Sequence, residues 1–382
     1  MPVSIFEEQL SRKPNQYPWT EQFIESMHNG FWTDKEFSFA SDVQQFKTEL
    51  DDQQKEIIVR TLSAVGQIEV AVKTFWAKLG ENLPHPALQD LGYVMANTEV
   101  IHNNAYERLL TVLDMEDIFE ENLKLDFIQG RVNYLRKYTH KFYKSSKKQY
   151  LYALTLFTLF VENVSLFSQF YIINWFARYK NVLKDTDQQV KYTRNEENIH
   201  ALVGMKIINT IREESPELFD EELEERIRGE AVDAFNAESK IVDWMINGID
   251  EPGLNATIVK EFIKNRINSS LEQIGFKGVF EVDESLLEST MWFEEELLGN
   301  NMTDFFIRKK SSVTFHDLMP NRIHEILLVA SPYDAFILEE DGHLTEQILT
   351  EYIGMNFNYA PRVTHVSTAQ ESFMLMSEKK FD

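Results

Sequence analysis

Apolar residues recur every three or four positions over residues 51–82, in a stripe formed by Ile57, Val65, Ile68, Val72 and Trp76. This spacing gathers apolar side chains on one face of a helix, and no proline interrupts the segment. Comparable patterns, bounded by Pro, Gly, Asn or Asp, cover residues 86–113, 123–145, 147–180, 187–213, 217–248 and 255–274. Several are far longer than the mean globular helix of about twelve residues. We therefore expect at least seven helices, packed as a large all-α bundle.

The segment LYALTLFTLFV at residues 151–161 is apolar enough to be mistaken for a membrane span. However, Glu162 and Asn163 follow it directly, and its apolar run is shorter than the roughly eighteen residues that a span requires. We interpret it as a helix buried in the core and expect no association with a membrane. A carboxylate such as Glu162 is costly to bury there unless it is paired or bound to a metal.

The pattern changes after about residue 320. Two runs typical of β-strands, IHEILLVAS at 323–331 and RVTHVST at 362–368, are each followed by a helical pattern, at 343–355 and 369–380. Such alternation of strands and helices predicts parallel strands joined by a crossover helix.

We therefore divide the chain into a helical domain at residues 1–310, a linker at 311–321 and a short α/β appendage at 322–382. The appendage is similar to the first half of a receiver domain. Two strands form an incomplete sheet, so this part of the chain is expected to be only a partial domain.

The chain is strongly acidic, because 38 Lys and Arg residues stand against 62 Asp and Glu residues, for a net charge of −24. Such a surface repels a phosphate backbone, so nucleic acid is not an expected partner. The absence of cysteine excludes disulfides, iron–sulfur clusters and thiolate metal sites, which leaves His and carboxylates to hold any metal. The N-terminal residues contain no uninterrupted apolar run of the kind found in export signals, and we expect a cytoplasmic protein.

Two Glu-x-x-His pairs stand in different predicted helices: Glu99 with His102, and Glu197 with His200. A spacing of three places both side chains of a pair on one helical face, where they can converge on a single ion. One such pair by itself is more often a surface carboxylate beside a hydrogen-bonded histidine. Two pairs, together with one Glu from each of two other helices, form the pattern of bundle proteins that hold a dinuclear metal site.

Glu69 and Glu162 can complete this set, because each lies within an apolar stretch of a further predicted helix. The alternative is that either carboxylate forms a buried ion pair with Arg or Lys, as buried acids commonly do. Considered together with the two histidine pairs, a dinuclear site is the favoured interpretation. Its oxygen and imidazole ligands suit iron or manganese, and its carboxylates can balance and bridge two divalent ions.

Tyr106 lies four residues after His102 and seven after Glu99, so the three residues share one helical face. The ordinary interpretation of a tyrosine in this position is a core residue. Beside an oxygen-activating pair of metal ions, its phenol could instead act as a one-electron donor, and burial would protect the radical.

With these residues in this order, the chain resembles the small, radical-generating subunit of class I ribonucleotide reductase, a ferritin-like family. The resemblance covers about residues 15–308. The motifs that carry it are YPW (17–19), FW (31–32), the run from Glu99 to Tyr106, ENVSLF (162–167), NEENIH (195–200) and TDFF (303–306). Together these motifs are specific, although no single one is.

The resemblance implies a ferritin-like homodimer, and an enzyme that is a ribonucleoside-diphosphate reductase. The ligands of its two metal ions would be Glu69, Glu99, His102, Glu162, Glu197 and His200. Tyr106 matches the radical tyrosine of the family, and Trp32 matches the tryptophan that begins electron transfer toward the large catalytic subunit. In this family the oxidised cofactor removes an electron from a cysteine of that subunit. The resulting thiyl radical reduces ribonucleotides to the deoxyribonucleotides needed for DNA replication.

Three features depart from the best-known members. The first ligand is Glu69 rather than Asp, and Lys73 can bring a cation to the site one turn later; both resemble the subgroup that uses two manganese ions activated by superoxide. We therefore favour two Mn ions over Fe/Fe or Mn/Fe, and Tyr106 would then be a bystander. Glu196 stands where an Asp usually couples proton and electron transfer. The C-terminal tail that docks on the large subunit is not recognisable after TDFF.

Three rival functions are compatible with parts of this pattern. A di-iron oxidase, hydroxylase or desaturase would use the same ligands with an apolar substrate pocket, but Trp32, Tyr106 and TDFF favour the reductase. A ferritin-like storage protein would bind many ions per chain; the acidic run at 221–230 could load them, although a solvated helical face explains it better. A helical interaction protein with incidental carboxylates would bind no metal.

Overall fold

The computed structural model describes residues 4–131, 146–297, 325–329, 331 and 362–378. Within helix α3 (Asp52–Ala77), the side chains of Gln67, Glu69, Val70 and Ala71 lie outside the described part. The chain divides into two compact units, Met1–Asn301 and Met302–Asp382. The linker at 311–321 lies outside the described residues, so its position stays a prediction.

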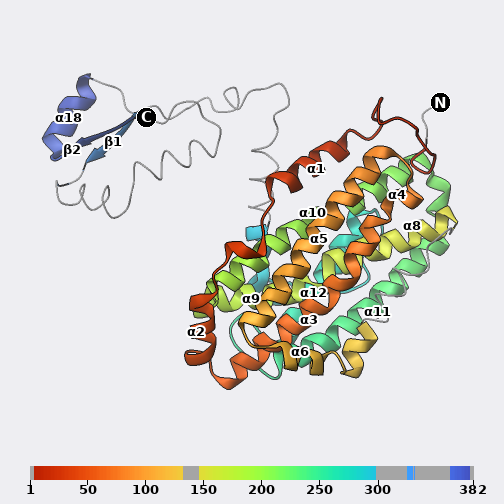
Figure 1. Cartoon of the computed structure of the whole chain (residues 1–382), viewed down its shortest axis with the longest axis horizontal. Coiled ribbons are helices and arrows are strands. Elements are labelled where there is room, and N and C mark those ends of the chain that lie inside the picture. The colour runs from red at the N-terminus through yellow and green to blue at the C-terminus, as the bar shows by residue number, and fades with distance from the viewer. Residues whose placement is uncertain (1–3, 132–145, 298–324, 330, 332–361, 379–382) are drawn as a thin grey trace. The chain divides into compact units, whose positions relative to one another are not determined.

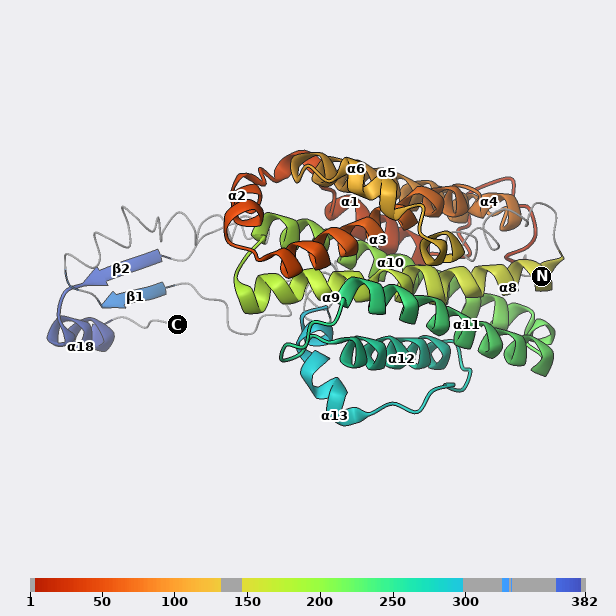
Figure 2. The same ribbon diagram turned by 90° about the horizontal axis from the view of Figure 1, so that it is seen from below.

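Long helices that run side by side dominate the first unit, and the predicted all-α bundle is confirmed there (Figure 1). Its helices are α1 (Trp19–Asn29), α2 (Ala40–Thr48), α3, α4 (Leu79–Asn82), α5 (Pro86–Val112), α6 (Glu116–Asn122), α8 (Lys147–Leu156), α9 (Phe167–Trp175), α10 (Lys184–Glu214), α11 (Glu221–Ile246), α12 (Ala256–Gln273) and α13 (Glu284–Leu287). Figure 2 shows α11 and α12 on one side of the bundle, α5 and α6 on the opposite side, and α9 and α10 between them. Short 3-10 helices lie at Asp34–Glu36, Pro216–Leu218 and Glu288–Thr290.

Polar side chains at the helix starts satisfy backbone groups that have no partner within the helix. Asp51 accepts a hydrogen bond from the backbone of Gln54, whose side chain in turn accepts from the backbone of Asp51. Asp220 and Asn255 cap α11 and α12 in the same way, through their side-chain oxygens. Pro86 occupies the first position of α5, where its missing N–H costs nothing.

The apolar segment after residue 146 is a continuous helical stretch, Lys147–Lys180. Within it, the π-helix η2 (Phe157–Ser165) joins α8 to α9, and the π-helix η3 (Phe176–Lys180) follows α9. Its most apolar 18-residue window has a mean hydropathy of 1.5, and all of that window is buried in the protein. The prediction of a core helix is therefore confirmed. The two π-helices were not predicted, and η2 contains Glu162. Such distortions occur preferentially at functional sites.

Two other predicted helices differ from the structure. The helix predicted at 51–82 is interrupted at Lys78, which separates α3 from α4. Of the helix predicted at 123–145, residues 126–131 are helical, and residues 132–145 lie outside the described part.

Two glycines allow the helices around Glu162 to approach each other closely. A Cβ on Gly204 of α10 would lie 2.8 Å from the Cβ of Thr158 in η2, and nearer still to its hydroxyl and methyl groups. A Cβ on Gly92 of α5 would lie 2.6 Å from the backbone oxygen of Trp76, near the end of α3. Any larger residue would push these helices apart, so the two glycines control the spacing of the elements that carry the candidate site.

In the second unit, β1 (Glu325–Val329) and β2 (Arg362–Val366) pair in parallel, with Glu325 opposite Arg362 and Val329 opposite Val366. Helix α18 (Ala369–Glu378) follows β2 and packs against both strands. The parallel pairing and the final helix agree with the α/β pattern of the sequence. The helix predicted at 343–355 lies outside the described residues.

Candidate metal centre

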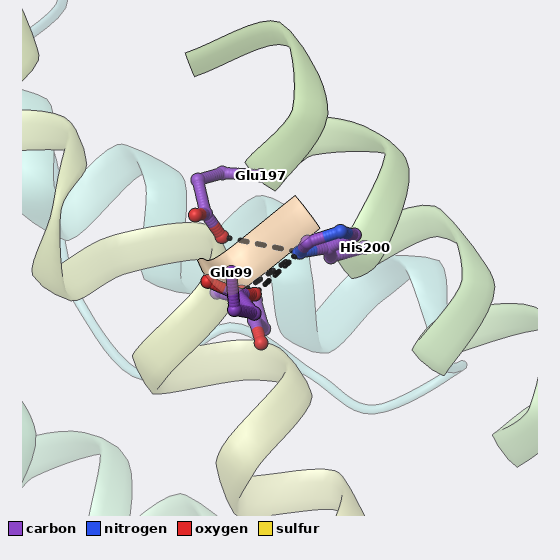
Figure 3. Close-up of side chains that lie close together, drawn as sticks. Glu99, Glu197 and His200 are labelled. Atoms are coloured by element: carbon purple, nitrogen blue, oxygen red, sulfur yellow. Dashed lines mark ion pairs between the residues drawn. The ribbon is translucent and has the colours of Figure 1, made fainter. Parts of the chain in front are cut away.

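Three segments of the bundle bring carboxylates and imidazoles to one buried point. Helix α5 supplies Glu99 and His102, η2 supplies Glu162, and α10 supplies Glu197 and His200; all five side chains are completely buried. Ligand atoms of Glu99, Glu162, Glu197 and His200 lie within 4.8 Å of one another. Figure 3 shows the side chains of Glu99, Glu197 and His200 converging. The structure thus brings together five of the six predicted metal ligands.

Glu99 and Glu197 each present one oxygen to each histidine. Nδ1 of His200 lies 2.9 Å from Oε1 of Glu99 and 3.5 Å from Oε2 of Glu197. Nδ1 of His102 lies 2.9 Å from Oε1 of Glu197 and 3.3 Å from Oε2 of Glu99. If two metal ions were bound, Glu99 and Glu197 would each offer them one oxygen beside each histidine.

The hydrogen bond made by Nε2 of each imidazole determines which ring nitrogen is left to bind a metal. Nε2 of His102 lies 2.7 Å from a carboxylate oxygen of Glu196, which can only accept a hydrogen bond when ionised. Nε2 of His200 lies 2.8 Å from the hydroxyl of Thr98, which itself donates to the backbone oxygen of Met95. In the neutral imidazoles Nε2 therefore carries the proton, and both Nδ1 atoms face the carboxylates. This tautomer is the one required for metal binding through Nδ1.

The charges in the cluster are strongly coupled. Burial raises the pKa of Glu162 well above its ordinary value, and the neighbouring Glu197 carboxylate adds to this shift. Burial acts in the same direction on Glu197, but contacts with Glu162, His102 and His200 outweigh it and hold the pKa of Glu197 below its usual range. Burial lowers the pKa of His200, but the Glu99 charge and contacts with Glu162 and Glu197 outweigh this and raise it. The pKa values of Glu162, Glu197 and His200 thus depend on one another, and bound cations would change this balance.

The donor atoms of this cluster fit a metal centre. When both imidazoles are neutral with the proton on Nε2 and the carboxylates are ionised, several donor atoms of the cluster have no hydrogen-bond partner among the described residues. These atoms are Glu99 Oε1, Glu162 Oε2, both oxygens of Glu197 and His200 Nδ1. Buried polar atoms without partners are costly, and here they point toward one another rather than toward a protein donor. Two divalent cations would satisfy all of them at once.

Three further predicted residues lie in α3 and α5. The backbone of Glu69, the sixth predicted ligand, lies in α3, and its side chain is outside the described part. Lys73 is half-buried one turn later in α3. Tyr106 is buried in α5, seven residues after Glu99. The roles of these three residues stay predictions.

Trp32 connects to the cluster through Glu196. Its indole Nε1 donates a hydrogen bond of 2.9 Å to Oε2 of Glu196, the same oxygen that lies 2.7 Å from Nε2 of His102. The rings of Trp32 and His102 are stacked, with centroids 6.2 Å apart and an angle of 27° between their planes. All three residues are buried. The predicted pair Trp32 and Glu196 is therefore in direct contact with a candidate ligand.

Two residues that contact the cluster, Trp76 and Thr98, were not predicted from the sequence. Nε1 of Trp76 donates a hydrogen bond of 2.6 Å to Oε1 of Glu162, although the sequence pattern placed this tryptophan in an apolar stripe. The alternative prediction was that Glu162 forms an ion pair with Arg or Lys. In the structure its Oε1 instead accepts a hydrogen bond from the indole of Trp76. The available signal was position: Trp76 lies two helical turns after Glu69, on the same face.

The family model for the small chain of ribonucleotide reductase matches residues 10–286. The chain belongs to this family. One relative is the ribonucleoside-diphosphate reductase subunit beta of Treponema pallidum, which is 23% identical to this chain over 312 residues. The match covers 79% of this chain and 88% of the relative.

Two solved structures have the same fold. The R2 subunit from Clostridium botulinum has a TM-score of 0.67 at 22% identity, covering 74% of this chain and 89% of its own. Dimanganese(II)-NrdF from Streptococcus sanguinis has a TM-score of 0.63 at 13% identity, covering 74% of this chain and 99% of its own. At these identities the likeness establishes the ferritin-like fold of the small chain.

Proposed function

We propose that this chain is the small subunit of a class I ribonucleoside-diphosphate reductase and holds a dinuclear metal centre. The observation that carries the proposal is the buried cluster in which Glu99 and Glu197 each face both His102 and His200. Membership of the small-chain family supports the same activity. Glu162 belongs to the cluster, and Glu69 is the proposed sixth ligand.

The two metal ions, when bound, supply the one-electron oxidant. The protein residues provide the path by which an electron reaches the site. Trp32 donates its indole N–H to Glu196, so this carboxylate is positioned to receive the indole proton when Trp32 gives up an electron. Because the same oxygen also contacts His102, a proton held there stays beside a metal ligand rather than entering solvent.

Two manganese ions are the cofactor we favour. Glu69 in place of Asp and Lys73 one turn later support this choice, with Fe/Fe and Mn/Fe centres as the alternatives. Carboxylate and imidazole ligands suit both metals, so the ligand set does not by itself select between them. In a dimanganese centre Tyr106 would be a buried bystander rather than the radical residue.

The proposed subunit acts with partners in the cytoplasm. It would form a homodimer and dock on the large catalytic subunit, whose cysteine would be oxidised through Trp32. The motif TDFF at 303–306 and the segment that follows it lie outside the described residues. The docking sequence is therefore not assigned.

The proposal is tested by loading the protein anaerobically with Fe(II) or Mn(II) and then exposing it to oxygen or superoxide. Metal analysis and electron paramagnetic resonance follow. Two metals per chain and a coupled Mn signal that arises only with superoxide would support the dimanganese reductase. A sharp organic radical that disappears in Tyr106→Phe would instead establish a tyrosyl mechanism.

The same preparation separates the reductase from its rivals. Combined with the large subunit of its source organism, the loaded protein should support reduction of ribonucleotides. A chain that binds two metals without supporting this reaction would be a ferritin-like oxidase or hydroxylase. Many ions per chain would indicate storage, and failure to bind metal stoichiometrically would overturn the dinuclear assignment.

A further inference from the structure

The indole of Trp76 binds directly to a carboxylate of the cluster. Its Nε1 donates a hydrogen bond of 2.6 Å to Oε1 of Glu162, and both side chains are completely buried. Trp76 comes from α3 and Glu162 from η2, so this contact joins two different elements of the bundle. The ring of Trp76 also lies 6.1 Å from that of His200, at an angle of 57°.

The position of this indole is fixed by its surroundings. The ring of Phe157 meets Trp76 edge to face, with centroids 5.5 Å apart, and Phe75 stacks on Phe157 at 3.7 Å. On the other side, the absence of a side chain at Gly92 admits the backbone of Trp76 against α5. An aromatic ring held on several sides has little freedom to rotate, so its N–H stays aimed at Glu162.

The two oxygens of Glu162 consequently have different surroundings. Oε1 is occupied by the indole N–H of Trp76. Oε2 lies 3.8 Å from Nδ1 of His200, inside the cluster. Oε1 is therefore held by Trp76, and Oε2 is the oxygen that lies beside a candidate ligand of the cluster.

Trp32 and Trp76 are placed differently with respect to the cluster. Trp32 reaches His102 through the intervening carboxylate of Glu196. Trp76 donates to a cluster carboxylate without an intermediary, and the rings packed against its outer side belong to the phenylalanines Phe75 and Phe157. This environment suits a residue that orients a ligand, whereas Trp32 has the carboxylate needed to accept a proton.

We infer that Trp76 is a positioning residue that restricts Glu162 to coordination of metal through a single oxygen, Oε2. The inference rests on the proposed function, because it requires that the cluster bind metal. An indole N–H can only donate, so its hydrogen bond anchors Oε1 and holds the carboxylate with Oε2 beside Nδ1 of His200. Groups that orient metal ligands in this way usually change metal affinity about tenfold to a hundredfold when they are removed.

The test compares Trp76→Phe with Trp175→Phe in the full-length protein. Both substitutions keep a buried aromatic ring and delete one indole N–H; that of Trp175 donates to the backbone oxygen of Pro252, outside the cluster. Crystal structures of the Mn(II)-loaded proteins show how Glu162 binds. Mn(II) titration followed by electron paramagnetic resonance gives the affinities, and thermal unfolding of the metal-free variants compares their stabilities.

We expect Glu162 to bind through Oε2 alone in the unsubstituted protein and in Trp175→Phe, and through both oxygens in Trp76→Phe. We also expect the affinity for at least one of the two ions to fall about tenfold or more in Trp76→Phe only. Coordination through both oxygens in the unsubstituted protein would overturn the inference, and this result does not depend on whether a variant folds. An affinity and a binding mode that are the same in both variants would overturn it as well.

These outcomes are distinct from a failure of the proposed function. If the unsubstituted protein does not bind Mn(II) in the cluster, the dinuclear centre itself is wrong. If it binds two ions and Trp76→Phe leaves Glu162 unchanged, the metal centre stands and only the role of Trp76 is refuted.

Discussion

Trp32 and His102 share a single oxygen atom of Glu196. The indole Nε1 lies 2.9 Å from this Oε2 and the imidazole Nε2 lies 2.7 Å from it, with all three side chains buried. One oxygen thus accepts from both rings, and this leaves the Nδ1 of His102 directed at Glu99 and Glu197. The connection from tryptophan to candidate metal ligand therefore runs through buried side chains.

Replacing Trp32 by Phe should separate metal binding from electron transfer. The phenyl ring keeps most of the packing but cannot donate to Glu196 or pass on an indole proton. We expect Trp32→Phe to retain two metals per chain and to lose at least about tenfold in nucleotide reduction with the large subunit. Metal analysis and the reductase assay measure the two effects, with Trp175→Phe as the control. Full activity in Trp32→Phe would contradict the proposed path.

Removing the charge of one cluster carboxylate should reduce the metal content. Glu197→Gln keeps the shape of the side chain but presents an amide where both histidines now face an ionised oxygen. We expect one metal or none per chain, measured by metal analysis after gel filtration. Glu69→Gln provides the same test for the sixth predicted ligand.

The matched control for these variants is Glu225→Gln, which alters an exposed acid of the run at 221–230 in α11. It should bind as much metal as the unsubstituted protein. An equal loss in Glu225→Gln and Glu197→Gln would instead indicate loading of ions on the acidic surface.

The contact between Gly204 and Thr158 should be sensitive to a single methyl group. In Gly204→Ala the new Cβ would lie 2.8 Å from the Cβ of Thr158, which forces α10 away from η2. We expect the free energy of unfolding to fall by about 1–3 kcal/mol in denaturant titrations. Gly229→Ala adds the same methyl group in α11, where nothing lies within 4 Å, and should raise stability by about 0.5–1 kcal/mol. Similar effects in both variants would show that packing at Gly204 is not limiting.

Loss of Arg131 should destabilise the core most strongly at high pH. Its Nε donates to Glu238 at 3.0 Å, its Nη1 donates to the backbone oxygen of Ala64, and both charged groups are buried. Arg131→Met leaves the Glu238 carboxylate without its cation. We therefore expect the free energy of unfolding to fall by about 3–5 kcal/mol near neutral pH.

The sign of the pH dependence follows from Glu238. Burial already raises the pKa of Glu238, although Arg131 opposes this shift, so the pKa rises further in Arg131→Met. A carboxyl group with a raised pKa in the folded state favours folding more when it is protonated, so the deficit should shrink from about pH 8 to about pH 5. Urea titrations of Arg131→Met and of the unsubstituted protein at both pH values measure this deficit in the free energy of unfolding. Lys148→Met, which removes two ion pairs at the surface, should change stability little. A stability deficit in Arg131→Met that is constant with pH would contradict the role given to Glu238.

Much of the bundle could be predicted from the sequence because helical periodicity is a local property. Stripes of apolar residues three and four positions apart identified α3, α5, α10, α11 and α12 to within a few residues. The π-helical form of η2 and the break at Lys78 were missed, since they depend on how neighbouring elements pack. The Glu-x-x-His spacing was equally informative, because residues three apart on a helix face the same way whatever surrounds them.

What the sequence by itself determined is thus which side chains share a helical face: Glu99 with His102, and Glu197 with His200. Tertiary structure alone decided which atoms of different helices meet. Trp76 and Glu162 are 86 positions apart; the place of Trp76 on the face of Glu69 could point to the cluster, but not to the carboxylate that its indole binds. That contact, like the oxygen shared by Trp32 and His102, exists because close packing of separate helices brings distant donors and acceptors within hydrogen-bonding distance.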